Sequence, residues 1–323
     1  MAGLTIMHQH HATLPTVRLA VASGGSGSPL LLLHAFPLDH SMWEAQNTLT
    51  DHLHLIVPDQ RGFGGSNDCL GNQTGAVPSS LQSIAQLADD AVALLDAMEI
   101  RQPLTVCGIS MGGYVAQHLA TRYPHRVRSL ILVATKLTAD TPEIRAGRSD
   151  LAAKVQRLGL EILATAMIPR LLAGSAEALA NPQRAEIEAS LRRMIHAQSV
   201  PTIVAALNAL SARPDMVAAM RSVRVPTLLI AGALDAITPP ACLEHAASVI
   251  QNARLVVVPE AGHMVPLESP ALFNAAVLDF LLTHGADPVA EKVGHLDRVA
   301  ADRVVADRVV RGGDRDQTRA VGD

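Results

Sequence analysis

The stretch that decides the fold is "LTVCGISMGGYVAQHLA", residues 104–120, in which a short apolar run meets a serine among glycines. The apolar run predicts a buried strand, and the residues after the serine predict a helix. Gly108, Ser110 and Gly112 therefore form a G-x-S-x-G motif at a strand-to-helix turn. Such a sharp turn strains the serine backbone and presents its hydroxyl, while the glycines let strand and helix approach. We predict that Ser110 is a nucleophile, the alternative being a serine that caps the helix.

Strand and helix signals alternate on both sides of this motif. Six apolar runs predict buried, mostly parallel strands at 29–37, 52–59, 103–108, 127–135, 225–232 and 253–262. Two more polar runs, 5–11 and 16–22, predict an outer antiparallel pair. Helical spacing covers 79–100, 111–124 and 269–285. The alternation indicates an α/β fold with a mostly parallel central sheet flanked by helices.

The strand signals divide the chain into segments. Residues 137–222 have none and are rich in Leu, Ala, Arg and Glu, which predicts an all-helical cap inserted between two strands. The core then comprises residues 1–136 and 223–285. Residues 286–323 repeat Asp-Arg-Val every five residues, and successive repeats are rotated by about 140° on a helix, so no apolar face forms. We expect this low-complexity tail to be disordered.

Composition excludes several classes of protein. Hydrophobic residues make up 49% of the chain, charged residues 17%, and the net charge is −4. With no basic stripe and only one Trp, two Tyr and four Phe, we expect no nucleic-acid partner. The scattered cysteines Cys69, Cys107 and Cys242 favour reduced thiols and a cytoplasmic location. No signal peptide or 18-residue apolar span is evident, so no membrane association is expected.

A base and an acid for Ser110 are found after two later strands. Asp235 follows the run 225–232 in "AGALDAITPP", and His263 follows the last predicted strand in "PEAGHMVPLESP". The order Ser110, Asp235, His263 suits a nucleophile, acid and base that meet at one edge of the sheet. Asp235 as a turn residue and His263 as a hydrogen-bonded loop residue stay open as alternatives. Other histidines are weaker candidates because they fall on helices or helix ends, namely His118, His125 and His245.

The segment "LLLLHAFP", residues 30–37, supplies a fourth component. It ends a predicted strand at a turn, where the backbone N–H of Phe36 can meet that of Met111. Two such donors form an oxyanion hole, which stabilises the charge of a tetrahedral intermediate. Loss of one donor commonly lowers the rate by about 10²- to 10³-fold.

Taken together, "HAFP", "PDQRGFGGS", "GISMGG", "AGALDAITP" and "AGHMVPLESP" resemble the α/β-hydrolase fold superfamily over residues 15–284. The chain is most similar to the branch of 3-oxoadipate enol-lactonase, small carboxylesterases and cofactor-free haloperoxidases. The resemblance implies a catalytic serine, acid and base at Ser110, Asp235 and His263. Ala35 departs from it, because the family usually has glycine before the oxyanion residue. If this turn needs a positive φ, Ala35 adds strain of about 1 kcal/mol.

The predicted function is hydrolysis of a small carboxylic ester or lactone through an acyl-enzyme, without cofactor or metal. The same residues can also serve a haloperoxidase or perhydrolase, a C–C bond hydrolase, an amidase or a thioesterase. A ligand-binding receptor on a hydrolase scaffold is the alternative of another class. An arginine in the pocket would favour a substrate that carries a carboxylate, such as the enol-lactone, and the cap offers Arg145, Arg148 and Arg170. The sequence carries no signal for the oligomeric state.

Several remaining features are expected to be structural. Asp59 and Arg61 are predicted to brace loops, and the glycine-rich runs 23–28 and 61–65 are predicted to be turns. The long loop 68–80 is a candidate rim of the active site. A polar strand edge, not a metal site, is expected at His8, His10 and His11.

Overall fold

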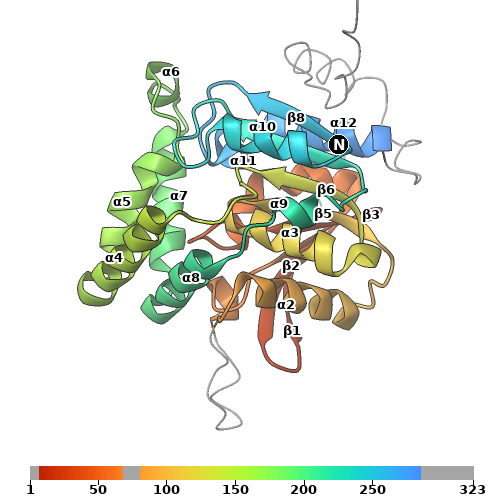
Figure 1. Ribbon diagram of the computed structural model, residues 1–323, viewed down its shortest axis with the longest axis horizontal. Helices are drawn as coiled ribbons and strands as arrows, with labels where there is room; N and C mark the ends of the chain where they lie inside the picture. The colour runs from red at the N-terminus through yellow and green to blue at the C-terminus, as the bar shows by residue number, and fades with distance from the viewer. Residues whose placement is uncertain (1–6, 68–80, 285–323) are drawn as a thin grey trace, which may run out of the picture.

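The computed structural model describes residues 7–67 and 81–284, and within them the chain forms one eight-stranded sheet (Figure 1). The strand order is β1-β2-β4-β3-β5-β6-β7-β8. β1 pairs antiparallel with β2, β2 pairs antiparallel with β4, and the remaining neighbours are parallel. The strands are β1 His8–Thr13, β2 Arg18–Gly24, β3 Ser28–Leu33, β4 Leu53–Pro58, β5 Leu104–Ile109, β6 Val127–Val133, β7 Thr227–Gly232 and β8 Ala253–Val258.

The burial of these strands follows their composition. Every residue of β5 and β7 is buried, because helices cover both faces of the parallel part of the sheet. β1 is an edge strand whose residues are mostly exposed, in keeping with its polar sequence. The predicted parallel strands and the outer antiparallel pair are therefore confirmed. The histidines of "HQHH" lie on this exposed edge, as the sequence indicated.

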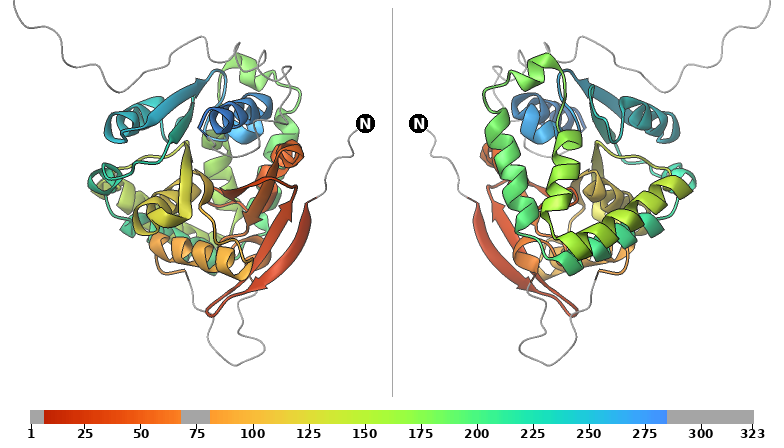
Figure 2. Two further views of the ribbon diagram at one scale, coloured as in Figure 1. Left: turned by 90° about the vertical axis from the view of Figure 1, so that its right-hand side faces the viewer. Right: turned by 90° about the vertical axis from the view of Figure 1, so that its left-hand side faces the viewer.

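Helices form a layer on each face of the sheet. α2, α3 and α10 lie on one face, while η1 and α12 lie on the other (Figure 2). The 3₁₀ helix η1 has no counterpart among the predicted elements; Asp39 begins it by accepting a hydrogen bond from the Ser41 N–H, and it buries Trp43. The bounds are η1 His40–Asp51, η2 Gly64–Ser66, α2 Ile84–Ala97, α3 Met111–Arg122, η3 Pro124–Arg126, α10 Pro240–Val249, α11 Val265–Glu268 and α12 Pro270–His284.

Between β6 and β7 the chain forms six helices, which we call the cap helices. They are α4 Pro142–Leu158, α5 Glu161–Leu171, α6 Ala176–Leu179, α7 Arg184–His196, α8 Val200–Ala212 and α9 Val217–Met220. α4, α5, α7 and α8 lie beyond the carboxyl ends of the parallel strands (Figure 1). The segment after β4 contacts the connection between α7 and α8, because the Gly64 N–H donates to Gln198 Oε1 at 2.9 Å.

Two predicted features fall outside the described residues, namely the tail 286–323 and the candidate rim loop 68–80. Across residues 7–67 and 81–284, no helix combines the length and the apolar character needed to cross a membrane.

Candidate active site

Ser110 occupies the turn between β5 and α3. Its φ and ψ are 52° and −110°, so this non-glycine residue adopts the strained backbone that the motif predicted. The turn is fixed on both sides: the Ser110 N–H donates to the Val133 carbonyl at 2.9 Å, and Thr135 Oγ1 donates to the Ser110 carbonyl at 3.1 Å. The Ser110 hydroxyl makes no helix-capping hydrogen bond, although the residue stands at the N-cap position. This geometry disfavours the capping role and leaves the hydroxyl available.

The glycines around Ser110 permit close approach of three backbone segments. A Cβ on Gly108 would lie 2.1 Å from the Gly112 carbonyl oxygen, and a Cβ on Gly112 would lie 2.2 Å from the Leu33 carbonyl oxygen. Both distances are far below van der Waals contact. Any side chain at either position would therefore push α3 away from β5 or β3 and open the turn that holds Ser110.

His263 and Asp235 meet in the structure. His263 Nδ1 lies 2.8 Å from Asp235 Oδ2, and both side chains are buried. Asp235 follows β7 and His263 follows β8, and these strands are parallel neighbours. Burial alone would raise the pKa of the Asp235 carboxyl, but the hydrogen bond and charge of His263 together with the hydrogen bonds from Thr238 outweigh it and hold this pKa below its usual range.

Thr238 contacts both Asp235 and His263, and the sequence did not predict this contact. Its hydroxyl donates to Asp235 Oδ2 at 2.7 Å and lies 3.3 Å from His263 Nδ1. The N–H groups of Ile237 and Thr238 donate to the other oxygen, Asp235 Oδ1, at 2.7 and 2.9 Å. All of these contacts fix the carboxylate toward the imidazole. The Asp-x-x-Thr spacing of a local side-chain turn was the signal that could have revealed Thr238.

The nucleophile candidate and the base candidate are brought to one edge of the sheet but are not hydrogen bonded. Ser110 follows β5 and His263 follows β8, so both lie at the carboxyl ends of parallel strands. Among the described residues no hydrogen bond joins Ser110 Oγ to the His263 ring. Catalytic hydrogen bonds of this kind often tighten only in the complex with substrate.

The turn after β3 carries the first predicted oxyanion donor. Among the residues that the structure describes, the backbone N–H groups of Phe36 and Met111 donate to no other group. Phe36 and Met111 are themselves buried, so each N–H is one for which a partner is expected. The positive φ considered for Ala35 does not occur, because Ala35 is absent from the left-handed residues. The strain in this region lies at Ser110 instead.

His34 fixes the turn after β3 that carries Phe36. The Gln60 N–H donates to His34 Nε2 at 2.9 Å, so this nitrogen is unprotonated, and His34 Nδ1 lies 3.0 Å from the Ala35 carbonyl oxygen. Complete burial lowers the pKa of His34, which agrees with a neutral ring. Gln60 Nε2 also donates to the His34 carbonyl at 2.9 Å. The neutral imidazole thus ties the turn before Phe36 to the end of β4.

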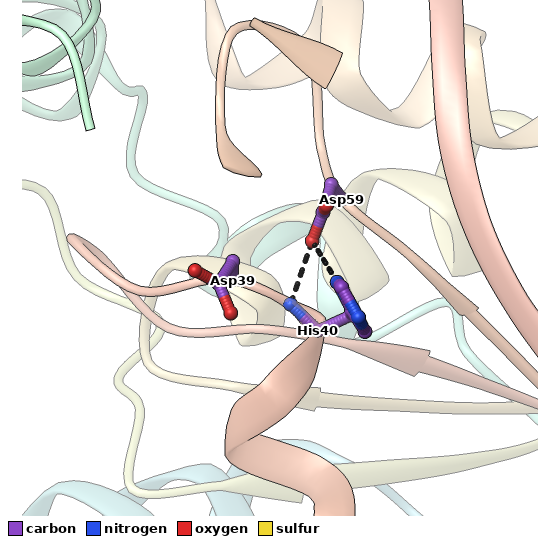
Figure 3. A group of neighbouring side chains, drawn as sticks. All are labelled: Asp39, His40 and Asp59. Carbon is purple, nitrogen blue, oxygen red and sulfur yellow. Dashed lines mark hydrogen bonds and ion pairs between the residues drawn. The ribbon is translucent and has the colours of Figure 1, made fainter. Parts of the chain in front are cut away.

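Asp39, His40 and Asp59 form a cluster beside this turn, with ligand-type atoms within 4.8 Å of one another (Figure 3). The oxygens of Asp59 are already occupied by protein donors. Oδ1 accepts from His40 N at 2.7 Å and lies 2.8 Å from His40 Nδ1, and Oδ2 accepts from the Gly65 N–H at 2.7 Å. The hydrogen bond to Asp59 raises the pKa of His40. Asp59 therefore braces the loops after β3 and β4, as predicted.

Arg61 is the second bracing residue predicted from the sequence. Its guanidinium binds Asp90 in α2 through Nε at 2.7 Å and through Nη2 at 2.5 Å. It also donates to the carbonyl of Thr16 at 3.1 Å. These contacts confirm a structural role, because they join the loop after β4 to α2 and to the segment before β2.

A second charged cluster, which we call the cap root, consists of Lys136, Asp140, Arg148 and Arg213. Asp140 is buried and receives Lys136 Nζ at 3.1 Å, Arg148 Nε at 2.6 Å and Arg213 Nη2 at 2.7 Å. Burial would raise the pKa of Asp140, but these cations lower it to about 2. Of the three cap arginines considered for a substrate carboxylate, Arg148 is thus paired, and the other two are exposed, Arg145 and Arg170.

Comparison with known proteins agrees with this geometry. Residues 28–270 match the family described as the alpha/beta hydrolase fold. The chain is 31% identical to 3-oxoadipate enol-lactonase 2 of Acinetobacter baylyi over 77% of this chain and 86% of that protein. It is 30% identical to pimeloyl-[acyl-carrier protein] methyl ester esterase of Nitrosomonas europaea, over 78% of this chain and 95% of that protein. The solved structure of a thermophilic esterase from Thermogutta terrifontis superposes on this chain with a TM-score of 0.77 and 34% sequence identity. The match covers 86% of this chain and 99% of the esterase chain. The chain belongs to the α/β-hydrolase fold family.

Proposed function

We propose that this protein is a serine hydrolase that cleaves a small carboxylic ester or lactone through an acyl-enzyme intermediate. Ser110 Oγ attacks the carbonyl carbon, and His263 takes up the hydroxyl proton at Nε2, because its Nδ1 faces Asp235 at 2.8 Å. Asp235 keeps the imidazole in this orientation and stabilises its charged form. Its other hydrogen bonds prevent it from turning away from the ring.

The oxyanion of the tetrahedral intermediate is bound by the N–H groups of Phe36 and Met111. Support comes from the fact that neither N–H donates to another group in the part of the chain that the structure describes. Met111 is the first residue of α3, so the positive end of the helix dipole also faces the developing charge.

Collapse of the intermediate breaks the bond to the alkoxy group, which receives the proton that His263 holds. With an ester, the alcohol departs and Ser110 remains acylated. With a lactone, the new hydroxyl stays on the acyl chain, so the acyl-enzyme carries a hydroxyacyl group. His263 then takes a proton from water, the resulting attack releases the carboxylic acid, and Ser110 regains its proton.

The observation that carries the proposal is the His263–Asp235 hydrogen bond at the same sheet edge as the strained Ser110 turn. Purely structural roles for Ser110, Asp235 and His263 do not require the three residues to lie at the same edge of the sheet. The relatives support the substrate class, because those reported above are named an enol-lactonase and esterases.

The test is a panel of p-nitrophenyl esters, lactones and thioesters assayed with the parent, Ser110→Ala and Ser248→Ala. Ser248 is the matched control, since it is exposed and donates only to the His245 carbonyl of its own helix, at 2.7 Å. We expect kcat to fall by about 10⁴- to 10⁶-fold in Ser110→Ala and to be unchanged in Ser248→Ala. Activity that survives in Ser110→Ala would refute the mechanism.

A further inference from the structure

In the loop that carries His263, residues 259–264 between β8 and α11, two backbone N–H groups bind one carboxylate. The N–H groups of Gly262 and Met264 both donate to Glu268 Oε1, at 3.0 and 3.2 Å. These two residues flank His263 on either side. The Oε1 atom of Glu268 therefore accepts from the Ala261–Gly262 peptide and from the His263–Met264 peptide, one on each side of the imidazole-bearing residue.

The second oxygen of Glu268 binds the cap. The Ala173 N–H, just after α5, donates to Glu268 Oε2 at 2.7 Å. The Met264 N–H also reaches the Leu171 carbonyl at 3.1 Å, and Arg184 of α7 donates to the Ala173 carbonyl at 2.5 Å. Residues 171–173, which we call the cap strap, are thus linked to the histidine loop by the carboxylate and by a direct backbone contact.

Steric contact leaves the histidine loop no room between the cap strap and the sheet. A Cβ on Gly262 would lie 2.5 Å from the Ala173 nitrogen. On the opposite side, a Cβ on Gly232 at the end of β7 would lie 2.0 Å from the Gly262 carbonyl oxygen. The Gly262 backbone is therefore packed closely between the cap strap and the end of β7, so a shift of the cap strap toward the sheet has to move the backbone next to His263.

The Glu268 carboxylate is held at a cost in electrostatic free energy. Burial raises the pKa of its carboxyl, even though three backbone N–H groups and the charge of Arg184 lower it. Among the described residues no cation lies within ion-pair distance of this carboxylate. A partly buried carboxylate held only by backbone N–H groups costs free energy that an apolar side chain would not. Its directional hydrogen bonds are what an apolar residue cannot replace.

We propose that Glu268 is a positioning residue that makes the orientation of the His263 imidazole depend on the placement of the cap strap. This role rests on the proposed function, in which His263 is the base for Ser110. Glu268 itself lies behind the histidine loop and touches no reacting atom. A cap strap seated on Oε2 keeps the Gly262 and Met264 peptides in place, and a displaced strap releases them.

Two variants separate the two halves of this contact. Glu268→Gln keeps one oxygen that can accept from Gly262 and Met264, but its NH₂ group then faces the Ala173 N–H, donor against donor. Glu268→Ala removes all three hydrogen bonds. Glu260→Gln is the matched control: Glu260 precedes His263 in the same loop and also binds the cap, through Ser175 Oγ at 2.6 Å, but it is exposed.

The experiment measures kcat and KM on p-nitrophenyl acetate well below the unfolding temperature of each variant, together with amide hydrogen exchange. We expect kcat to fall by about 10- to 100-fold in Glu268→Ala with KM within about twofold, because misplacement of a catalytic group by 1 Å costs about that much. The kcat of Glu268→Gln should lie between that of Glu268→Ala and that of the parent. The kcat of Glu260→Gln should equal that of the parent. In Glu268→Ala, exchange should quicken about tenfold in residues 171–173 and 261–264.

A folded Glu268→Ala protein with kcat within twofold of the parent would overturn the positioning role. If this variant does not fold, Glu268→Gln provides the same comparison, and parental kcat there has the same meaning. Turnover that persists in Ser110→Ala would refute the proposed function instead. Hydrogen exchange tests the link between the cap strap and the histidine loop independently of activity. Exchange at the parental rate in residues 171–173 and 261–264 of the Glu268 variants would contradict this link.

Discussion

Two of the places that link the cap to the core are built in opposite ways, and at the first, the cap root, the core contributes Lys136. At the cap root, Asp140 pairs with three cations, and its nearest contact is Arg148 Nε at 2.6 Å. At the histidine loop, Glu268 accepts three backbone N–H groups and has no cation at ion-pair distance among the described residues. Cations lower the pKa of Asp140 to about 2, whereas burial raises the pKa of Glu268.

The two contacts differ in function: the cap root attaches the cap, whereas the Glu268 contact positions the histidine loop. The cap-root ion pairs join Asp140 to Lys136, Arg148 and Arg213, none of which is a proposed catalytic residue, so the cap root can hold the cap without setting the position of a reacting group. Hydrogen bonds to backbone N–H groups depend on angle and distance, so the histidine loop transmits small displacements. We therefore expect changes at the cap root to lower stability more than turnover, and changes around His263 to do the reverse.

The largest expected effect lies on the histidine side, in Asp235→Asn. An amide at this position can accept from Ile237 and Thr238 but favours the wrong tautomer of His263, and kcat should fall by about 10⁴-fold. Steady-state kinetics on p-nitrophenyl acetate measure the loss, and thermal unfolding should show little change. A decrease smaller than tenfold would mean that Asp235 does not orient the base.

The next effect lies at the cap root, in Asp140→Ala. The Arg213 side chain is only 2% exposed, so removing its partner leaves a buried charge unpaired, and the free energy of unfolding should fall by about 3 kcal/mol. Urea unfolding measures this loss, while kcat of the folded protein should stay within about threefold of the parent. Asp150→Ala is the control, because its pair with Lys154 is exposed and should contribute less than about 0.5 kcal/mol. Equal destabilisation by both variants would contradict the buried attachment.

The smallest effect is the pH dependence of the two carboxylates. The pKa of Asp140 is lowered from 3.8 to about 2, so its stabilisation is present above pH 3.8 and is lost as the pH falls toward 2, a change of about 2 kcal/mol. Asp140→Asn should therefore lose less stability than the parent over this interval. The pKa of Glu268 is raised above 4.5, so its ionisation reduces stability as the pH rises through the shifted pKa. Glu268→Gln should remove that decline.

These pH dependences are measured as variant-minus-parent differences in urea unfolding between pH 2 and pH 7, which cancel the titration of other groups. Opposite slopes for the Asp140 and Glu268 variants would sharpen the comparison. If both differences in the free energy of unfolding changed with pH in the same direction, the cap root and the Glu268 contact would not differ as proposed.

The sequence was sufficient for the features that depend on neighbours along the chain. The apolar runs predicted the strands, since burial on both faces requires continuous hydrophobic residues. Gly108 and Gly112 predicted the strained Ser110 turn, because the local backbone needs their lack of a side chain. The adjacent strands β7 and β8 then brought Asp235 and His263 together.

Features that depend on distant contacts were not predictable. Glu268 binds Ala173, 95 residues away, and nothing in either local sequence signals the contact. The role of His34 depends on Gln60, at the end of another strand. Whether the turn at Ala35 needs a positive φ was likewise not decided by the sequence, and the structure shows that it does not.

The most direct test of the central claim is to trap the acyl-enzyme. The protein is mixed with excess p-nitrophenyl acetate, quenched in acid during turnover, and analysed by intact mass and peptide mapping. We predict a single acetyl group, located on Ser110 in the parent and absent from Ser110→Ala. Turnover with no acylated chain, or with the acyl group on another residue and unaffected by Ser110→Ala, would contradict the account.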